Sequence, residues 1–206
     1  MKILQPSVEV EPFDGDQMLR NLERAGRTCY KSESKITNTS ATNFILNIIK
    51  RGHESVLEHE KITVRVICDR GVSHELVRHR IASYSQESTR YVKYKDEIEV
   101  IEPCFWDKEK NALLYRRWEN AMLMAERSYK NLIDLNVSPQ EARTVLPNSL
   151  KTEIVVTMNL RSWRNFLKLR CAKPAHPQIR QIAFMILDEF YKAIPAVFND
   201  IKEELT

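Results

Sequence analysis

Glycine is scarce in this chain of 206 residues, which has only Gly15, Gly26, Gly52 and Gly71. No two of them lie close enough for a G-x-G-x-x-G or G-x-x-x-x-G-K loop, so Rossmann and P-loop phosphate binding are excluded. Any phosphate group must therefore be held by side chains or by helix N-termini.

Cysteines and long apolar runs are also few, and charge of neither sign dominates. The four cysteines form no C-x-x-C pair and match no zinc spacing, which predicts free thiols in a reducing compartment. No apolar stretch approaches the ~20 residues of a membrane span, and the first residues are too weakly apolar for a signal peptide, so we expect a cytoplasmic protein. The net charge of +4 is too small to indicate a nucleic-acid binder but suits a pocket for small anions.

The apolar residues predict helices and strands without a strict β-α-β alternation. Helical spacing predicts helices over 41–50, about 108–135 and from about 177 onward. Strands are predicted over 62–68, where apolar and polar residues alternate, over 98–100, and over the β-branched run 154–158. The long helix is expected to bury a stripe that includes Leu114 and Ala121. We therefore predict an α+β fold in which residues 1–206 form a single domain.

Capping residues mark where several elements begin and end. Gly52 is expected to stop the first predicted helix, and Ser73 to cap a short helix. Residues 138–141 form a capping box. Asn159 is expected to cap a helix whose Trp163 and neighbouring apolar residues belong to the core.

The densest polar segment runs from residue 78 to residue 91. On a helix, Arg78-His79-Arg80 would point about 100° apart, so these side chains could surround an extended anion such as a pyrophosphate. If the following chain is extended, Gln86, Ser88 and Arg90 share one face. A solvated basic helix end followed by a polar loop would explain the same residues.

Two further segments carry candidate site residues. The run from His53 to His59 lacks the H-E-x-x-H and H-x-x-E-H metal spacings, so we expect no metal site, and His53 could instead line a pocket. Arg161 and Asn165 are four residues apart and share a helix face. Arg170 falls at that helix's C-terminal end, where the helix dipole alone would favour a cation.

Four ordered blocks resemble the flavin-dependent thymidylate synthases (the ThyX family). Arg78-His79-Arg80, seven residues and then Ser88 match that family's RHR-x7-S signature. The segments 52–59, 142–147 and 159–170 are similar to its flanking blocks. Because the four blocks occur in the right order and spacing, the resemblance covers roughly residues 50–185.

The resemblance implies the reaction and its cofactors. The family converts dUMP to dTMP, with methylenetetrahydrofolate as carbon donor, NADPH as reductant and reduced FAD as hydride source. It implies an α+β fold without a Rossmann domain, a mainly antiparallel sheet, and a homotetramer with FAD sites shared between subunits. It implies no protein cysteine nucleophile and neither a nucleic-acid nor a membrane partner.

The resemblance also assigns residues by position. Arg170 would be catalytic, helping to ionise the uracil ring. Those expected to contact FAD are His53, Ser55, Arg78, His79, Arg80, Gln86, Asn159, Arg161 and Asn165. Those expected to bind dUMP are Glu75, Arg78, Gln86, Glu87, Ser88, Thr89, Arg90, Arg143 and Arg170.

Three departures from the family pattern leave alternatives open. Ser85-Gln86-Glu87 stands where many members have Asn-Glu-x, Glu75 stands where glutamine is common, and the segment 171–180 is about two residues longer. One alternative is a related flavoprotein that modifies another pyrimidine nucleotide. The other is a nucleic-acid-binding module, for which the interleaved basic and aromatic residues of segment 78–94 would be the contact surface.

Overall fold

The computed structural model describes residues 1–94 and 96–205. The strands are β1 (Lys2–Leu4), β2 (Ser7–Val10), β3 (Lys61–Asp69), β4 (Ser83–Gln86), β5 (Glu99–Ile101) and β6 (Lys151–Asn159). The α-helices are α1 (Gly15–Thr28), α2 (Ser40–Lys50), α3 (Arg70–Leu76), α4 (Ala112–Asp134), α5 (Pro139–Ala142), α6 (Leu160–Arg170), α7 (Pro177–Ala193) and α8 (Pro195–Leu205). The 3-10 helices are η1 (Glu33–Lys35), η2 (Glu54–His59) and η3 (Arg143–Val145).

A four-stranded antiparallel sheet forms the middle of the molecule, with strand order β2-β3-β6-β4. β3 and β6 pair along nine residues, from Lys61 opposite Asn159 to Asp69 opposite Lys151. A separate parallel pair joins β1 to β5. The predicted α+β fold with a mainly antiparallel sheet is confirmed.

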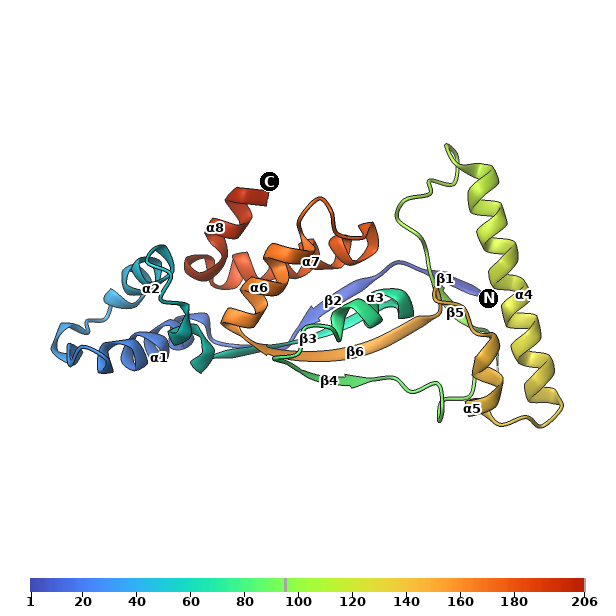
Figure 1. The fold of residues 1–206 in the computed structure, drawn as a ribbon, viewed down its shortest axis with the longest axis horizontal. Helices are drawn as coiled ribbons and strands as arrows, with labels where there is room; N and C mark the ends of the chain where they lie inside the picture. The colour runs from blue at the N-terminus through green and yellow to red at the C-terminus, as the bar shows by residue number, and fades with distance from the viewer. Residues whose placement is uncertain (95, 206) are drawn as a thin grey trace.

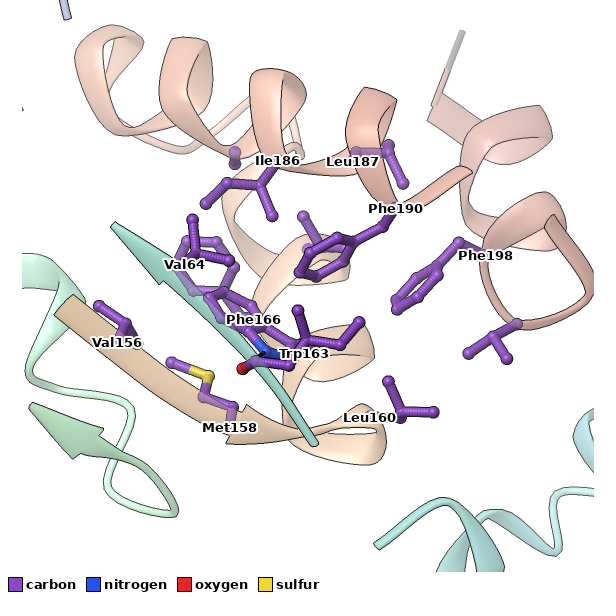
Figure 2. Packing of buried hydrophobic residues seen from close by; sticks show 14 of the residues in the cluster. Val64, Val156, Met158, Leu160, Trp163, Phe166, Ile186, Leu187, Phe190 and Phe198 are labelled. Atoms are coloured by element: carbon purple, nitrogen blue, oxygen red, sulfur yellow. Dashed lines mark hydrogen bonds between the residues drawn. The ribbon is translucent and has the colours of Figure 1, made fainter. Parts of the chain in front are cut away.

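Helices α6 and α7 bury one face of this sheet, and α8 packs against both of them and against α2 (Figure 1). Trp163 and Phe166 of α6 pack with Phe190 of α7 against the strands, and Figure 2 shows these rings beside Val64 and other apolar side chains. The Trp163 indole donates a hydrogen bond to the Ile62 carbonyl oxygen at 2.9 Å, so its one polar atom is satisfied inside the core.

α3 packs on β3, β6 and α7, while α1, α2, α4 and α5 lie at the two ends of the sheet (Figure 1). α1 and α2 pack on each other at the end where β6 runs into α6. α4 and α5 lie at the opposite end, where Trp118 and Met122 of α4 cover Val100 of β5 in a second apolar cluster. No helix within the described ranges is long and apolar enough to cross a membrane.

Local pattern predicted α2, β3, β6 and the start of α6 correctly. Gly52 has a φ of 72° and ends α2, with its N–H bonded to the Ile49 carbonyl and that of His53 to the Ile48 carbonyl. The Asn159 side chain accepts from the Ser162 N–H at 2.8 Å, which confirms that cap. α5 begins with the predicted capping box of Ser138 and Glu141.

Three details of the prediction were wrong. α3 is capped by Asp69, which accepts from the Val72 N–H at 2.8 Å, while Ser73 lies inside the helix and donates to the Arg70 carbonyl at 2.9 Å. The long helix begins at Ala112. Of its predicted stripe, Trp118, Met122, Tyr129 and Ile133 are buried as expected, but Leu114 and Ala121 are exposed, because Tyr115 and Glu126 complete the buried side in their place.

Some elements were not predicted. The strands β1 and β2 have only three and four residues. α1 was not predicted either, although it buries Met18, Leu19 and Leu22 along one side at helical spacing. The helix from Pro177 was predicted as the last one, but Ile194 ends it and Pro195 starts α8.

Candidate active site

A groove of about 780 Å³ lies where the chain leaves α3, between α6 and η2. Among its lining residues are seven of the predicted site residues: Arg78, His79, Arg80, Asn159, Arg161, Asn165 and Arg170. The tertiary structure thus brings together two blocks that are about 80 residues apart in the sequence.

A second and larger hollow of about 1080 Å³ lies beside the groove. His53 and Ser55 line it, in agreement with the prediction that His53 lines a pocket. Glu54 and Arg161 line both hollows, so the two form adjoining parts of one concave surface. The left-handed Gly52 turn sends the chain from α2 into η2 and so places these residues.

The basic run 78–80 is not helical, contrary to the sequence expectation. α3 ends at Leu76, and the run follows in the turn and extended chain beyond it. The Tyr84 hydroxyl holds this turn by donating to the carbonyls of Leu76 at 2.8 Å and His79 at 2.6 Å. Arg78 and Arg80 are exposed, and within the described ranges neither side chain forms an ion pair.

Arg170, at the end of α6, is held by two groups from the α3 region. Its Nη1 donates to Glu75 Oε2 at 2.7 Å, and its Nε donates to His79 Nε2 at 3.0 Å. Its Nη2 also donates to the Glu75 carbonyl oxygen at 3.4 Å. Its side chain is 22% exposed, so the guanidinium reaches the groove while all three of its nitrogens are engaged. Glu75 therefore stands beside the predicted catalytic residue as its ion-pair partner.

His79 is neutral in this arrangement. Burial lowers the pKa of its imidazole to about 4, and the adjacent Arg170 charge acts in the same direction. The ring also packs edge-on against Phe166, with centroids 4.9 Å apart. Since Nε2 accepts the hydrogen bond from Arg170, the ring proton belongs on Nδ1.

Along its whole length, α6 presents one mostly polar face to the groove. Arg161, Asn165, Lys168 and Leu169 lie on this face at helical spacing. Arg161 pairs with Glu58 of η2 at 2.5 Å, and both side chains are about half exposed. Such an exposed pair contributes little to stability, so Arg161 can exchange its partner for an anionic ligand.

The predicted nucleotide-binding residues Gln86 to Arg90 lie at and beyond the end of β4 and do not line the groove. β4 ends at Gln86, whose amide donates to Ser73 Oγ at 2.9 Å and Thr152 Oγ1 at 3.1 Å. Ser88 begins a turn and accepts from the Arg90 N–H at 3.3 Å. The expected shared face of Gln86, Ser88 and Arg90 was therefore wrong, because the strand stops before Ser88.

Glu87 is engaged within the chain at both carboxylate oxygens. Oε1 accepts from the Tyr94 hydroxyl at 2.7 Å, and Oε2 accepts from Lys151 Nζ at 3.3 Å. Burial and this carboxylate raise the pKa of Tyr94. The contacts tether the turn that carries Ser88 and the buried Thr89 to the end of β6.

Arg143 is exposed at the start of η3, near the α4–α5 end of the molecule. The run 78–80 and α6 lie at the opposite end of β6, a strand whose nine residues span ~27 Å (Figure 1). One chain therefore presents two separate clusters of the predicted site residues and does not gather them into one hollow.

Sequence reasoning missed several groove residues. Glu54, Ser162 and Lys168 line the groove, and Arg164 lies buried directly behind it. The spacing of residues 161, 165 and 168 on one helix face could have revealed Lys168. No local pattern marks Glu54 or Arg164, because their contacts join segments 110 residues apart.

The cysteines and acidic residues form no alternative centre among residues 1–94 and 96–205. No group of three or more His, Cys, Asp and Glu side chains there is placed to hold a metal ion. Burial raises the pKa of the Cys104 thiol, the cysteine of the only Pro-Cys pair, so it stays protonated at neutral pH.

Comparisons with known proteins agree over most of the chain. The family described as "Thymidylate synthase complementing protein" matches residues 15–196. The flavin-dependent thymidylate synthase of Geobacter sulfurreducens is 38% identical over 185 residues, covering 85% of this chain and 78% of that protein. The Mycolicibacterium gilvum protein of the same name is 36% identical over 204 residues, covering 92% and 82%.

A solved structure shows the same fold. The UMP/dUMP methylase PolB from Streptomyces cacaoi, bound with 5-Br dUMP, matches with a TM-score of 0.83. The match covers 98% of this chain and 97% of that chain at 23% sequence identity.

Proposed function

Because this chain belongs to the flavin-dependent thymidylate synthase family, we propose that it converts dUMP to dTMP by reductive methylation, with FAD as its cofactor. Methylenetetrahydrofolate supplies the carbon and NADPH the reducing equivalents. The observation that carries this proposal is the groove lined by Arg78, Arg80 and Arg170 together with the neutral His79.

The donor set of the two hollows fits a flavin dinucleotide. The groove is lined by the cations Arg78, Arg80, Arg161, Lys168 and Arg170, against the carboxylates Glu54 and Glu58. Guanidinium groups bind diphosphate oxygens in bidentate fashion. Asn165 offers an amide for a ring edge, and the hollows have the volumes expected for ligand pockets. His53, Ser55 and Asn159 complete the proposed FAD contacts.

Arg170 acts on the substrate in this proposal. A fixed cation stabilises the negative charge that develops on the uracil ring and so makes its C5 atom nucleophilic. Glu75 and His79 hold the guanidinium at 2.7 and 3.0 Å, which limits the reorganisation needed when the charge appears. When bound, reduced FAD supplies the hydride, while the protein orients the reactants.

We propose that the nucleotide phosphate is bound by the other cluster, with Arg90 and Arg143 as its cations and Ser88 and Thr89 as hydroxyl donors. Arg78 completes the dUMP contacts from the groove. Gln86 and Glu87 already form hydrogen bonds within the chain. They would therefore contact dUMP only through the hydrogen-bonding capacity that these bonds leave free.

A second copy of the chain would complete the site. Within one chain the groove and the Ser88–Arg90 turn lie toward different ends of β6, which supports this proposal. A homotetramer with FAD sites shared between subunits would bring the two clusters together. We place the enzyme in the cytoplasm, where its nucleotide substrates and reduced thiols are maintained.

The reaction itself provides the test. Purified protein is incubated anaerobically with FAD, NADPH, dUMP and methylenetetrahydrofolate, and the nucleotide is analysed by mass spectrometry. We expect dTMP, and only when FAD is present. FAD binding with an unchanged dUMP would refute the proposed reaction, and a product with a different added group would favour the related flavoprotein. UMP in place of dUMP measures selectivity for the sugar.

A further inference from the structure

Arg164 of α6 is a charged side chain in the core. Its side chain is 1% exposed, unlike the groove residues on the same helix. A buried guanidinium requires partners for its donors, because removing one partner leaves an uncompensated charge. Its partners therefore show what this residue does.

Two carboxylates from different segments share this guanidinium. Asp200 of α8 binds it through both oxygens, at 2.7 Å to Nη1 and 2.6 Å to Nη2. Glu54 of η2 accepts from Nη2 at 3.1 Å and from Nε at 3.3 Å with the same oxygen, Oε1. Nη1 also donates to the Val197 carbonyl oxygen in the first turn of α8. Arg164 thus joins the C-terminal helix to the η2 turn.

Glu54 is the member of this network that reaches the ligand surface. It lines both hollows, and it lies between His53 and Ser55, which line the larger one. Its side chain is 22% exposed, and its Oε1 is held by two donors of one rigid guanidinium. α8 contributes no described residue to the lining of either hollow, yet its Asp200 orients the group that holds Glu54.

We propose that Arg164, aligned by Asp200, is a positioning residue that fixes Glu54 and the turn 53–55 for flavin nucleotide binding. The inference rests on the proposed function and extends it to the C-terminal helix. In this arrangement, α8 controls the affinity of a site that it does not touch. The bidentate geometry sets the plane of the guanidinium, and the plane sets where Glu54 is held.

The experiment compares two variants that each remove one carboxylate from a contact of α8. Asp200→Asn disrupts the pair with Arg164, and Asp188→Asn disrupts the pair between α7 and Lys202 of α8. The side chains of Asp200 and Asp188 are 47% and 49% exposed, so the two variants match in charge, chemistry and exposure. FAD affinity is measured by flavin fluorescence titration, and stability by urea denaturation.

We expect Asp200→Asn to weaken FAD binding at least fivefold, while Asp188→Asn stays within twofold of the wild type. Removing a negative charge by itself would strengthen binding of the anionic cofactor, so weaker binding must come from lost positioning. Equal FAD affinity in Asp200→Asn and wild type would overturn the inference. So would an equal loss in Asp188→Asn, because it would show a general effect of α8 docking.

A double-mutant cycle supplies a readout that a purely structural role would not move. If Asp200 acts through Glu54, the effect of Asp200→Asn on FAD affinity should shrink in a Glu54→Gln background. Additive effects would refute that route. Arg164→Lys, which keeps the charge but loses the planar fork, should weaken FAD binding as Asp200→Asn does. A wild-type protein that fails to bind FAD would instead refute the proposed function, and this inference with it.

Discussion

The neutral state of His79 makes a quantitative prediction about acid stability. The imidazole has a pKa of about 4 in the folded protein because it is partly buried and lies beside Arg170. In the unfolded chain its pKa returns to about 6.5. The unfolded state therefore binds the proton more tightly, and the folded state loses stability as pH falls from 6.5 toward 4.

The size of the effect follows from these two pKa values. At pH 5 most unfolded chains carry the His79 proton and most folded chains do not, which costs about 2 kcal/mol relative to pH 8. Other groups titrate in the same window, so the comparison needs a variant without this imidazole. His79→Gln keeps an oxygen acceptor for the Arg170 Nε–H and removes the titration.

The assay is urea denaturation of the FAD-free protein at pH 8 and pH 5, at one protein concentration. We expect the wild type to lose about 2 kcal/mol more than His79→Gln over this interval. NMR titration of the five histidines, with His79 assigned by its absence from the variant, should give a pKa near 4. Equal pH dependence in both proteins, or a His79 pKa near 6.5, would refute the reasoning.

Substitutions at three further positions test the catalytic group, the core and the turn into the site. Arg170→Ala should lower dTMP formation about 100-fold or more while FAD still binds, as fluorescence titration and mass spectrometry can show; unchanged turnover would contradict its role. Trp163→Ala should cost about 3–5 kcal/mol of unfolding free energy in urea, and Trp163→Phe clearly less. Gly52→Ala should cost about 1 kcal/mol of unfolding free energy, because φ at this position is 72°. The added Cβ meets nothing within 4 Å, so the cost would come from the backbone alone, and a neutral result would argue against backbone strain.

Local sequence patterns determined the elements that frame the site. Buried and less buried residues alternate along β3 because one face of the strand is covered. Its apolar residues predict this alternation without knowledge of the partner strand. The helix stop at Gly52 and the cap at Asn159 depend on groups within three or four residues. The motif blocks also indicated residues that line the groove, because a family signature identifies residues by their sequence positions and does not require their spatial arrangement.

Tertiary structure alone decided the partners of these residues. Arg170 meets Glu75 across 95 positions, and Arg164 meets Glu54 across 110. The run 78–80 was considered as part of a helix, but it lies beyond the end of α3. The Tyr84 hydroxyl, from the following strand, bonds to the carbonyls of Leu76 and His79 at this point. The sequence determined which residues could form helices, strands and a cationic site, because those preferences are local. Only the folded chain decided which charges face each other, because that choice depends on segments brought together by the sheet and its core.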